Sequence, residues 1–320
     1  PAKHAQLIVG DRILDRCVER QVPVRIPAAV RAEVQSLALD SKVTAGESVA
    51  ISVGSRGIAN IALIIKSLVE ELKGLGLEPF LVPAMGSHGG GVAEAQQAII
   101  EGYGVTEEYT GAPIKASMET VQVGETEDGV PVFFDKYAYE ADHVAVGGRI
   151  KPHTDFVGEI ESGLHKMMLI GLGKHKGAAL YHQAIVHYSF DRIIRSVGQT
   201  VVDKCGVLLG LGLVENQYDK TALIKGVGAE ELVEREKELL ILAKKWMPRL
   251  PFETVDLLIV DEIGKNISGA GMDTNVVGRK FHDNHAAEKE YPKVTRILVR
   301  GLTEETHGNA NGVGLADIIT

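Results

Sequence analysis

Residues 47–76 read ESVAISVGSRGIANIALIIKSLVEELKGLG, and this stretch decides the fold of the chain. Its first part, 47–53, is rich in β-branched and small apolar residues, which is typical of a buried strand. After the turn GSRG, apolar residues recur at helical spacing until glycines end the segment. Residues 78–104 repeat this order as EPFLVPAMG, SHGGG and VAEAQQAIIEGYG. Two strand, loop and helix units in succession predict an α/β fold with a largely parallel sheet.

The chain beyond these units predicts more strands and helices. ETVQVGE and GVPVFF flank TEDG, whose Asp-Gly pair suits the turn of a β-hairpin. We expect strands at 143–148, 206–215 and 221–227, and helices at 190–204 and 229–247.

Two prolines in PRLPFETV, at 248–255, mark a linker, and a new strand and loop pattern begins with DLLIVDEIG. We therefore predict two α/β domains with largely parallel sheets, at 1–249 and 250–320, and an active site in the inter-domain cleft. The last residues, HGNANGVGLADIIT, end on an apolar run that reads as the opening of a helix. We expect the second domain to be incomplete at its C-terminus.

The composition describes a globular protein and argues against several classes. Of the 320 residues, 45% are hydrophobic and 24% are charged, which allows a full core. A formal net charge of -9 argues against a surface that binds nucleic acid. We expect no membrane span and no secretory signal, because no long apolar run occurs. Cys17 and Cys205 are far apart in the sequence, so we expect no disulfide framework and a cytoplasmic location.

Polar side chains follow three predicted strand ends. They are Arg56 in VGSRGIAN, His88 in MGSHGGG and His153 in IKPHTDF. Because the carboxyl ends of parallel strands meet at one edge of a sheet, these residues are candidates for one site. An arginine in this position grips a carboxylate or phosphate, and histidine titrates near neutral pH. The alternatives are a surface ion pair for Arg56 and structural roles for the two histidines.

Generic motifs add little to these candidates. GSHGGG and GLGKHKG lack the Lys-Ser/Thr ending of a phosphate-binding P-loop, and no G-x-S-x-G elbow is present. FHDNH places His282 and His285 three residues apart, a spacing that could hold a metal ion. THGNANGVGLAD, with His307, could line the inter-domain cleft or form a capping turn.

Histidine is concentrated in one part of the chain, since six of the eleven histidines lie between 143 and 187. Within GEIESGLHKMMLIGLGKHKGAALYHQA, at 158–184, Lys166 and His182 are sixteen residues apart. This density favours proton transfer or metal ligation.

The ordered set of Arg56, His88, His153, Lys166 and His182 resembles the nickel-pincer lactate racemase family in order, spacing and loop context. The resemblance implies that Arg56 binds the substrate carboxylate and that the two earlier histidines are catalytic. It implies that Lys166 carries a nickel-pincer nucleotide covalently and that His182 ligates the nickel. Lys174, His175 and Lys176 then remain as a solvated turn, and His165 and His187 as solvated or supporting residues.

The resemblance also implies an isomerase, a racemase or epimerase of a 2-hydroxy acid. In such a reaction the C2 hydrogen leaves as hydride and returns to the other face of a 2-keto acid. Two histidines on opposite sides of the substrate suit this chemistry as acid and base. Enzymes that synthesise the cofactor are implied as partners.

The chain departs from the family pattern at several places. Val53 stands where the lactate enzymes have an aspartate, a departure that argues against lactate itself and leaves the 2-hydroxy acid open. The family's second domain supplies a lysine near the substrate, for which DEIGKNISGAGMDTN offers Lys265, with Lys280 nearby.

Two rival hypotheses remain open. A zinc-dependent hydrolase would use His153 and His182 with the His282 and His285 pair. A non-catalytic binding module would use Arg56 and the glycine loops to hold an anion.

Overall fold

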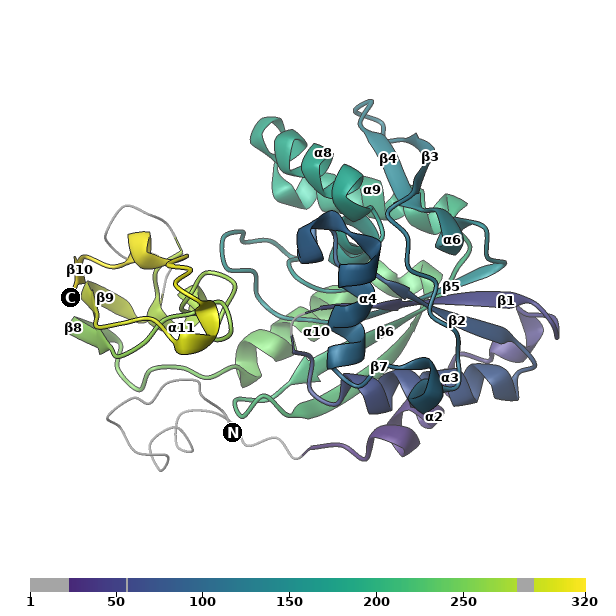
Figure 1. Cartoon of the computed structure of the whole chain (residues 1–320), viewed down its shortest axis with the longest axis horizontal. Coiled ribbons are helices and arrows are strands. Elements are labelled where there is room, and N and C mark those ends of the chain that lie inside the picture. Colours follow the sequence, from purple (N-terminus) through teal and green to yellow (C-terminus); the bar gives the residue numbers. More distant parts are fainter. Residues whose placement is uncertain (1–22, 56, 281–290) are drawn as a thin grey trace.

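The structure is a computed structural model that describes residues 23–55, 57–280 and 291–320. Three residues of the predicted sites, Arg56, His282 and His285, lie outside this part of the chain. Figure 1 shows a large body built on one sheet and a smaller unit at one end of the molecule. The chain is a mixed α/β protein with mostly parallel sheets, as the strand and helix pattern predicts. No helix in the described ranges is long and apolar enough to cross a membrane.

A five-stranded sheet with the order β2-β1-β5-β6-β7 forms the centre of the large body. Strands β1, β2, β5 and β6 run parallel, and β7 is antiparallel to β6. The bounds are Ser48–Val53 for β1, Glu78–Pro83 for β2, His143–Arg149 for β5, Val207–Glu215 for β6 and Thr221–Gly228 for β7.

Both faces of this sheet are covered, which explains why its strands read as continuous apolar runs. Alternate residues of β1 face opposite ways: Val49 and Ile51 belong to the core under α2 and α3, and Ala50 to the core under α9 and α10. The helix bounds are Ile26–Ser36 for α2, Ile61–Gly74 for α3, Ala93–Gly102 for α4, Phe190–Lys204 for α9 and Leu232–Trp246 for α10.

The predicted hairpin is present as β3 (Thr120–Glu125) and β4 (Pro131–Asp135), which pair antiparallel. It packs with α8 (Lys174–His187) and α9 on one side of the central sheet (Figure 1). Two single-turn helices, α5 (Glu107–Thr110) and α6 (Lys136–Tyr139), precede and follow the hairpin in the sequence. Short 3-10 helices occur at Leu39–Ser41, His88–Gly91, Ala229–Glu231, Glu304–Thr306 and Val313–Leu315.

A broken helix follows the loop after β5. It consists of α7 (Leu164–Lys166), a π-helical segment Met167–Gly171, and α8 (Lys174–His187). The prediction of a solvated turn at residues 174–176 is wrong for Lys174, which is fully buried. Its ammonium lies 2.9 Å from the carboxylate of Asp135. The sequence does not reveal this pairing because the two residues are neighbours only in the folded chain.

The smaller unit contains a second parallel sheet with the order β10-β9-β8. Its elements are β8 (Thr254–Val260), α11 (Thr274–Val277), β9 (Lys293–Val299) and β10 (Ile318–Ile319). The apolar run at the end of the sequence was expected to open a helix, and instead it forms β10. Its residues pair with Leu298 and Val299 because β9 offers a free edge. The division of the chain at residues 249 and 250 stays a prediction.

Candidate functional site

The order of the strands determines where a site can form. The chain passes from β1 to β2 on one side and from β5 to β6 on the other, so the direction of winding reverses between β1 and β5. Open α/β sheets bind ligands at such a switch point, outside the carboxyl ends of the strands. Ser55 follows β1, and His153 follows β5. These two loops therefore border the expected site.

His88 lies in a glycine loop whose backbone is held by hydrogen bonds from a side chain of α4. Gly89, Gly90 and Gly91 all have positive φ angles, which a residue with a side chain rarely adopts. The Nε2 amide of Gln96 in α4 donates to the carbonyl oxygens of Gly86, at 2.9 Å, and His88, at 3.0 Å. The loop backbone is thus fixed by a buried amide.

The imidazole of His88 contacts the loop that follows β1. Its Nδ1 lies 2.6 Å from Oγ of Ser55, next to the predicted carboxylate-binding Arg56. The structure therefore brings the ends of β1 and β2 together through a side-chain hydrogen bond. If the Ser55 hydroxyl accepts this bond, Nδ1 carries the proton of the neutral ring and Nε2 is the acceptor nitrogen.

Hydrogen bonds fix the tautomer of His153. Its Nδ1 accepts from the backbone N–H of Asp155, at 3.0 Å, and of Phe156, at 3.3 Å. An acceptor Nδ1 places the proton of the neutral ring on Nε2. The ring packs against Phe156 and Phe190, with centroids 4.7 and 5.7 Å away. His153 is therefore held as a hydrogen-bond donor through Nε2.

The surroundings of His153 keep it neutral. Burial is the largest cause that lowers its pKa to about 2, and nearby positive charge adds to the effect. The groups that contribute this charge are Lys166, Lys280, Lys151 and His182. Two of the predicted residues, Lys166 and His182, therefore lie within electrostatic range of His153.

Lys166 and His182 lie on different parts of the broken helix. Met167 packs where Gly54 and Gly148 have no side chain, so α7 reaches the ends of β1 and β5. Lys166 is half-buried there, and His182 is exposed on α8. The pKa of His182 is lowered, first by partial burial of the ring and then by Lys166. The neutral form of His182 is thus favoured, in part by the positive charge of Lys166.

His165, next to Lys166, is not solvated. It is buried, and its Nδ1 lies 2.6 Å from the carboxylate of Glu236, which also accepts its backbone N–H at 3.0 Å. Glu236 belongs to α10, so this pair ties α7 to the helix beneath it. His175 and His187 are exposed, as expected for solvated residues.

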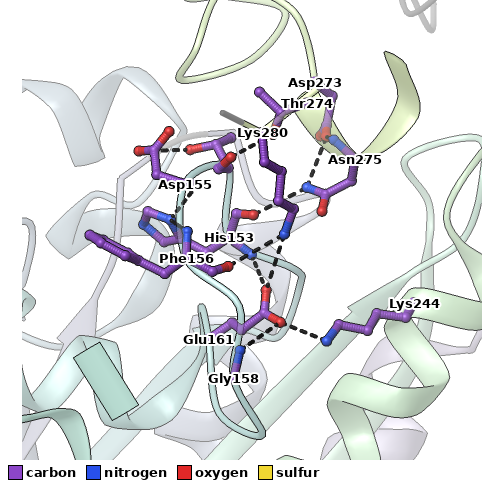
Figure 2. Close-up of polar contacts among 11 residues, drawn as sticks. His153, Asp155, Phe156, Gly158, Glu161, Lys244, Asp273, Thr274, Asn275 and Lys280 are labelled. Atoms are coloured by element: carbon purple, nitrogen blue, oxygen red, sulfur yellow. Dashed lines mark hydrogen bonds and ion pairs between the residues drawn. The ribbon is translucent and has the colours of Figure 1, made fainter. Parts of the chain in front are cut away.

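Glu161 organises the loop that carries His153, as Figure 2 shows. The buried carboxylate accepts from the backbone N–H of His153 at 2.6 Å and of Gly158 at 3.3 Å. Nζ of Lys244, from α10, donates to it at 2.6 Å. Glu161 is not among the residues predicted from the sequence, where it stands out only as a carboxylate that follows the apolar Ile160. A buried charge of this kind needs such partners.

Residues of the smaller unit complete the surroundings of His153 (Figure 2). Asn275 donates to the His153 carbonyl oxygen at 3.3 Å, and Oγ1 of Thr274 donates to the Thr154 carbonyl oxygen at 2.6 Å. Nζ of Lys280 donates to the Phe156 carbonyl oxygen at 3.3 Å and lies 3.9 Å from Glu161.

The lysine predicted near the substrate from the second domain was Lys265. Its side chain is exposed in the loop after β8, whereas Lys280 is 10% exposed and acts on His153. Lys280 is thus the lysine of the smaller unit that the structure brings to the histidine. His307 is exposed at the C-terminal end of a 3-10 helix, in agreement with a capping turn.

A metal site within residues 23–55, 57–280 and 291–320 would need several ligand side chains close together. No group of three or more His, Cys, Asp or Glu residues is arranged there to hold a metal ion. The zinc site of the rival hypothesis includes His282 and His285, which fall outside these ranges.

Comparison with known proteins gives one family and one fold. The family model for the lactate racemase N-terminal domain matches residues 15–192. A search of curated protein sequences finds no match. The structure is similar to that of the lactate racemase apoprotein from Thermoanaerobacterium thermosaccharolyticum, with a TM-score of 0.50 and 13% identity. The likeness covers 90% of this chain and 66% of that one, just under two thirds, and at this identity it shows the fold alone. The family match spans more than half of the chain, which therefore belongs to the lactate racemase N-terminal domain family.

Proposed function

We propose that this protein is a racemase or epimerase of a 2-hydroxy acid that uses a nickel-pincer nucleotide. One observation carries the proposal: His153 lies within electrostatic range of both Lys166 and His182 at the carboxyl edge of the sheet. The matched family segment contains all three residues. A zinc hydrolase leaves Lys166 without a role, and an anion-binding module has no need of His88 and His153.

The donor set suits the proposed cofactor. Lys166 would carry it covalently, and His182 would bind the nickel ion through an imidazole whose lowered pKa keeps it neutral. Glycines at positions 54 and 148 leave room for the chain that bears Lys166 to approach the strand ends. When bound, the group would supply a hydride acceptor for the C2 hydrogen of the substrate.

The protein's own residues would move the proton. With Nδ1 of His88 bound to Ser55, Nε2 of His88 would accept the hydroxyl proton of one enantiomer. The neutral His153 would offer its Nε2–H as a hydrogen bond to the substrate oxygen, and the protonated His88 would return the proton when the keto acid is reduced. Arg56 would hold the substrate carboxylate, with Lys280 adding positive charge near His153.

Intact-mass spectrometry tests the cofactor assignment. Protein produced together with cofactor-synthesis enzymes should carry an adduct of several hundred daltons and bind nickel. Lys166→Ala should lose the adduct, whereas Lys176→Ala, at an exposed lysine of α8, should retain it. Stoichiometric zinc without an adduct, under conditions that load a lactate racemase, would contradict the proposal.

Isotope labelling tests the reaction. A 2-hydroxy acid deuterated at C2 should keep its deuterium when the loaded enzyme inverts it, because the hydrogen travels as hydride. Incorporation of solvent deuterium at C2 would indicate proton abstraction and rule out this mechanism.

A further inference from the structure

Glu215, the last residue of β6, connects the carboxyl ends of three neighbouring strands, since β5 lies between β1 and β6 in the sheet. Oε2 of Glu215 accepts from Nη1 of Arg149, at the end of β5, at 2.6 Å. Oε1 accepts from the backbone N–H of Ala59, in the loop that follows β1, at 2.8 Å. The side chain of Glu215 is only 8% exposed, so water competes little for these bonds.

The loop between β1 and α3 is held in position by such bonds. Gly57 and Asn60 have positive φ angles, so the backbone there follows neither a strand nor a helix. Both backbone groups of Ala59 are bonded to side chains: its N–H donates to Glu215, and its carbonyl oxygen accepts from Oγ1 of Thr221 at 3.1 Å. Because Thr221 begins β7, side chains of β6 and β7 together fix the end of this loop.

The same loop reaches His88 through Ser55. Oγ of Ser55 lies 2.6 Å from Nδ1 of His88, so the bond between them selects one tautomer of the neutral imidazole. The chain between Ser55 and Ala59 is short, and a segment of this length spans at most about 14 Å. The place of Ala59 therefore restricts the place of the Ser55 hydroxyl.

A second glutamate makes similar bonds at the opposite edge of the sheet. Oε2 of Glu47 accepts from the backbone N–H of Thr44 at 2.6 Å and lies 2.8 Å from Nε2 of His143, the first residue of β5. Glu47 thus joins the segment before β1 to β5, as Glu215 joins the loop after β1 to β5. The candidate site lies at the carboxyl edge, so Glu47 is a matched comparison away from it.

We propose that Glu215 is a positioning residue for His88: it holds the loop after β1 so that the Ser55 hydroxyl stays bonded to the imidazole. That His88 acts as an acid and base rests on the proposed function. The positioning by Glu215 is a property of the protein without cofactor, and it is measured there.

The chemical shifts of the imidazole nitrogens test this role, measured by NMR on the full chain without cofactor at a pH where the rings are neutral. His88→Gln identifies the signals of His88, and Ser55→Ala shows where they lie without the serine bond. Glu215→Leu should move the His88 signals toward their positions in Ser55→Ala, because the imidazole then exchanges between both tautomers. Glu47→Leu should leave them in place.

Two results would overturn the proposal. Unchanged His88 signals in Glu215→Leu would show that Ser55 keeps its place without this carboxylate. Equal movement in Glu215→Leu and Glu47→Leu would show a general weakening of the sheet.

Hydrogen exchange at the Ala59 amide gives a second measurement. Exchange should be at least about tenfold faster in Glu215→Leu, the effect of a lost bond to a charged acceptor. Glu215→Gln keeps an acceptor oxygen for Ala59 and should restore most of the protection and of the His88 shifts. If Glu215→Leu does not fold, Glu215→Gln replaces it, and faster Ala59 exchange with unmoved His88 signals would refute the positioning role.

The outcome is separate from that of the proposed function. Absence of the Lys166 adduct in the wild-type protein would refute the cofactor chemistry, whereas the His88 signals are recorded on unloaded protein. Unmoved His88 signals would refute the role of Glu215 and leave the cofactor chemistry untouched.

Discussion

Individual buried charges hold this structure together at points far apart in the sequence. Lys174 and Asp135 pair with no exposure of either side chain, and His165 and Glu236 are each 1% exposed. Burial raises the pKa of Asp135 and lowers that of Lys174, while their mutual attraction opposes both shifts. Such a pair is sensitive to the loss of one partner, since the other charge then stays buried alone.

Replacing Lys174 by methionine should destabilise the fold strongly. Asp135 would lose its cation in the core, which costs about 3 kcal/mol or more. Lys176→Met, at an exposed lysine of the same helix that loses only a surface contact with the Phe133 ring, should cost no more than about 1 kcal/mol. Urea unfolding measures both variants. Equal midpoints for the two would show that the buried pair adds nothing.

His153 should make stability depend on pH in the acid range. It titrates near 6.5 in the unfolded chain and at about 2 when folded, so only the unfolded chain binds the proton between these values. Stability should therefore fall as the pH drops below about 6.5, by at most about 1.4 kcal/mol per pH unit.

Comparison of His153→Gln with the exposed His187→Gln isolates this effect. Between pH 7 and pH 5, wild type and His187→Gln should lose about 2 kcal/mol more unfolding free energy than His153→Gln. A parallel loss in all three proteins would refute the assignment of a neutral His153.

The sequence predicted the surroundings of some residues correctly and of others wrongly. His88 and His153 stand in glycine and proline contexts at strand ends, and the expectation that they follow β2 and β5 is met. Lys174 and His165 were predicted to be solvated or, for His165, supporting, because lysine and histidine near glycines are usually exposed, but both are buried. Their burial depends on Asp135 and Glu236, which no local pattern connects to them.

At the level of elements, the loop from β5 to α7 is the part that most directly shapes the site. It has little regular structure and is organised by the carboxylate of Glu161, which joins the loop backbone to Lys244 of α10. The position of His153 is thus set by a buried side chain, and a change at Glu161 should act through the loop.

Glu161→Gln should lower the local stability of this loop without changing its conformation. The loss of a charged acceptor for Lys244 and the His153 N–H should cost about 2 kcal/mol of unfolding free energy. Hydrogen exchange at the His153 amide should become faster. Glu159→Gln is the control, since that side chain is 68% exposed and should matter by less than about 1 kcal/mol. Unaltered exchange in Glu161→Gln would show that the loop is held by other contacts.

The regular elements of the large body could be read from the sequence. The helix expected at 190–204 is α9 with the same bounds, and the strand expected at 47–53 is β1, which begins one residue later. The π-helical segment 167–171 was not foreseen, because its apolar residues fit any helix. Packing decides its form: Gly171 lies against Ala84 at the end of β2.

For the whole molecule, the relation between the two sheets matters most. The smaller unit contacts the His153 loop through Thr274, Asn275 and Lys280, all at or near α11 (Figure 2). Because these contacts end on backbone carbonyls of residues 153–156, the unit should stabilise that loop.

Thr274→Val tests this contact. The buried hydroxyl donates to the Thr154 carbonyl at 2.6 Å, and its loss should cost about 1 kcal/mol. Amide exchange should rise in both α11 and the His153 loop, whereas Thr320→Val, at an exposed residue of the same unit, should leave it unchanged. A rise confined to α11 would indicate that the loop is stable without the smaller unit.

The sequence by itself determined the α/β class, the hairpin, the parallel strands and the residues that stand at strand ends. Periodicity and turn residues are local, and they are enough for these features. Only the tertiary structure decided that Lys174 is buried, that Glu161 supports His153 and that Lys280 reaches it from the smaller unit. These three features depend on contacts between residues as many as 124 positions apart in the sequence. Such contacts form only when the sheets and helices pack.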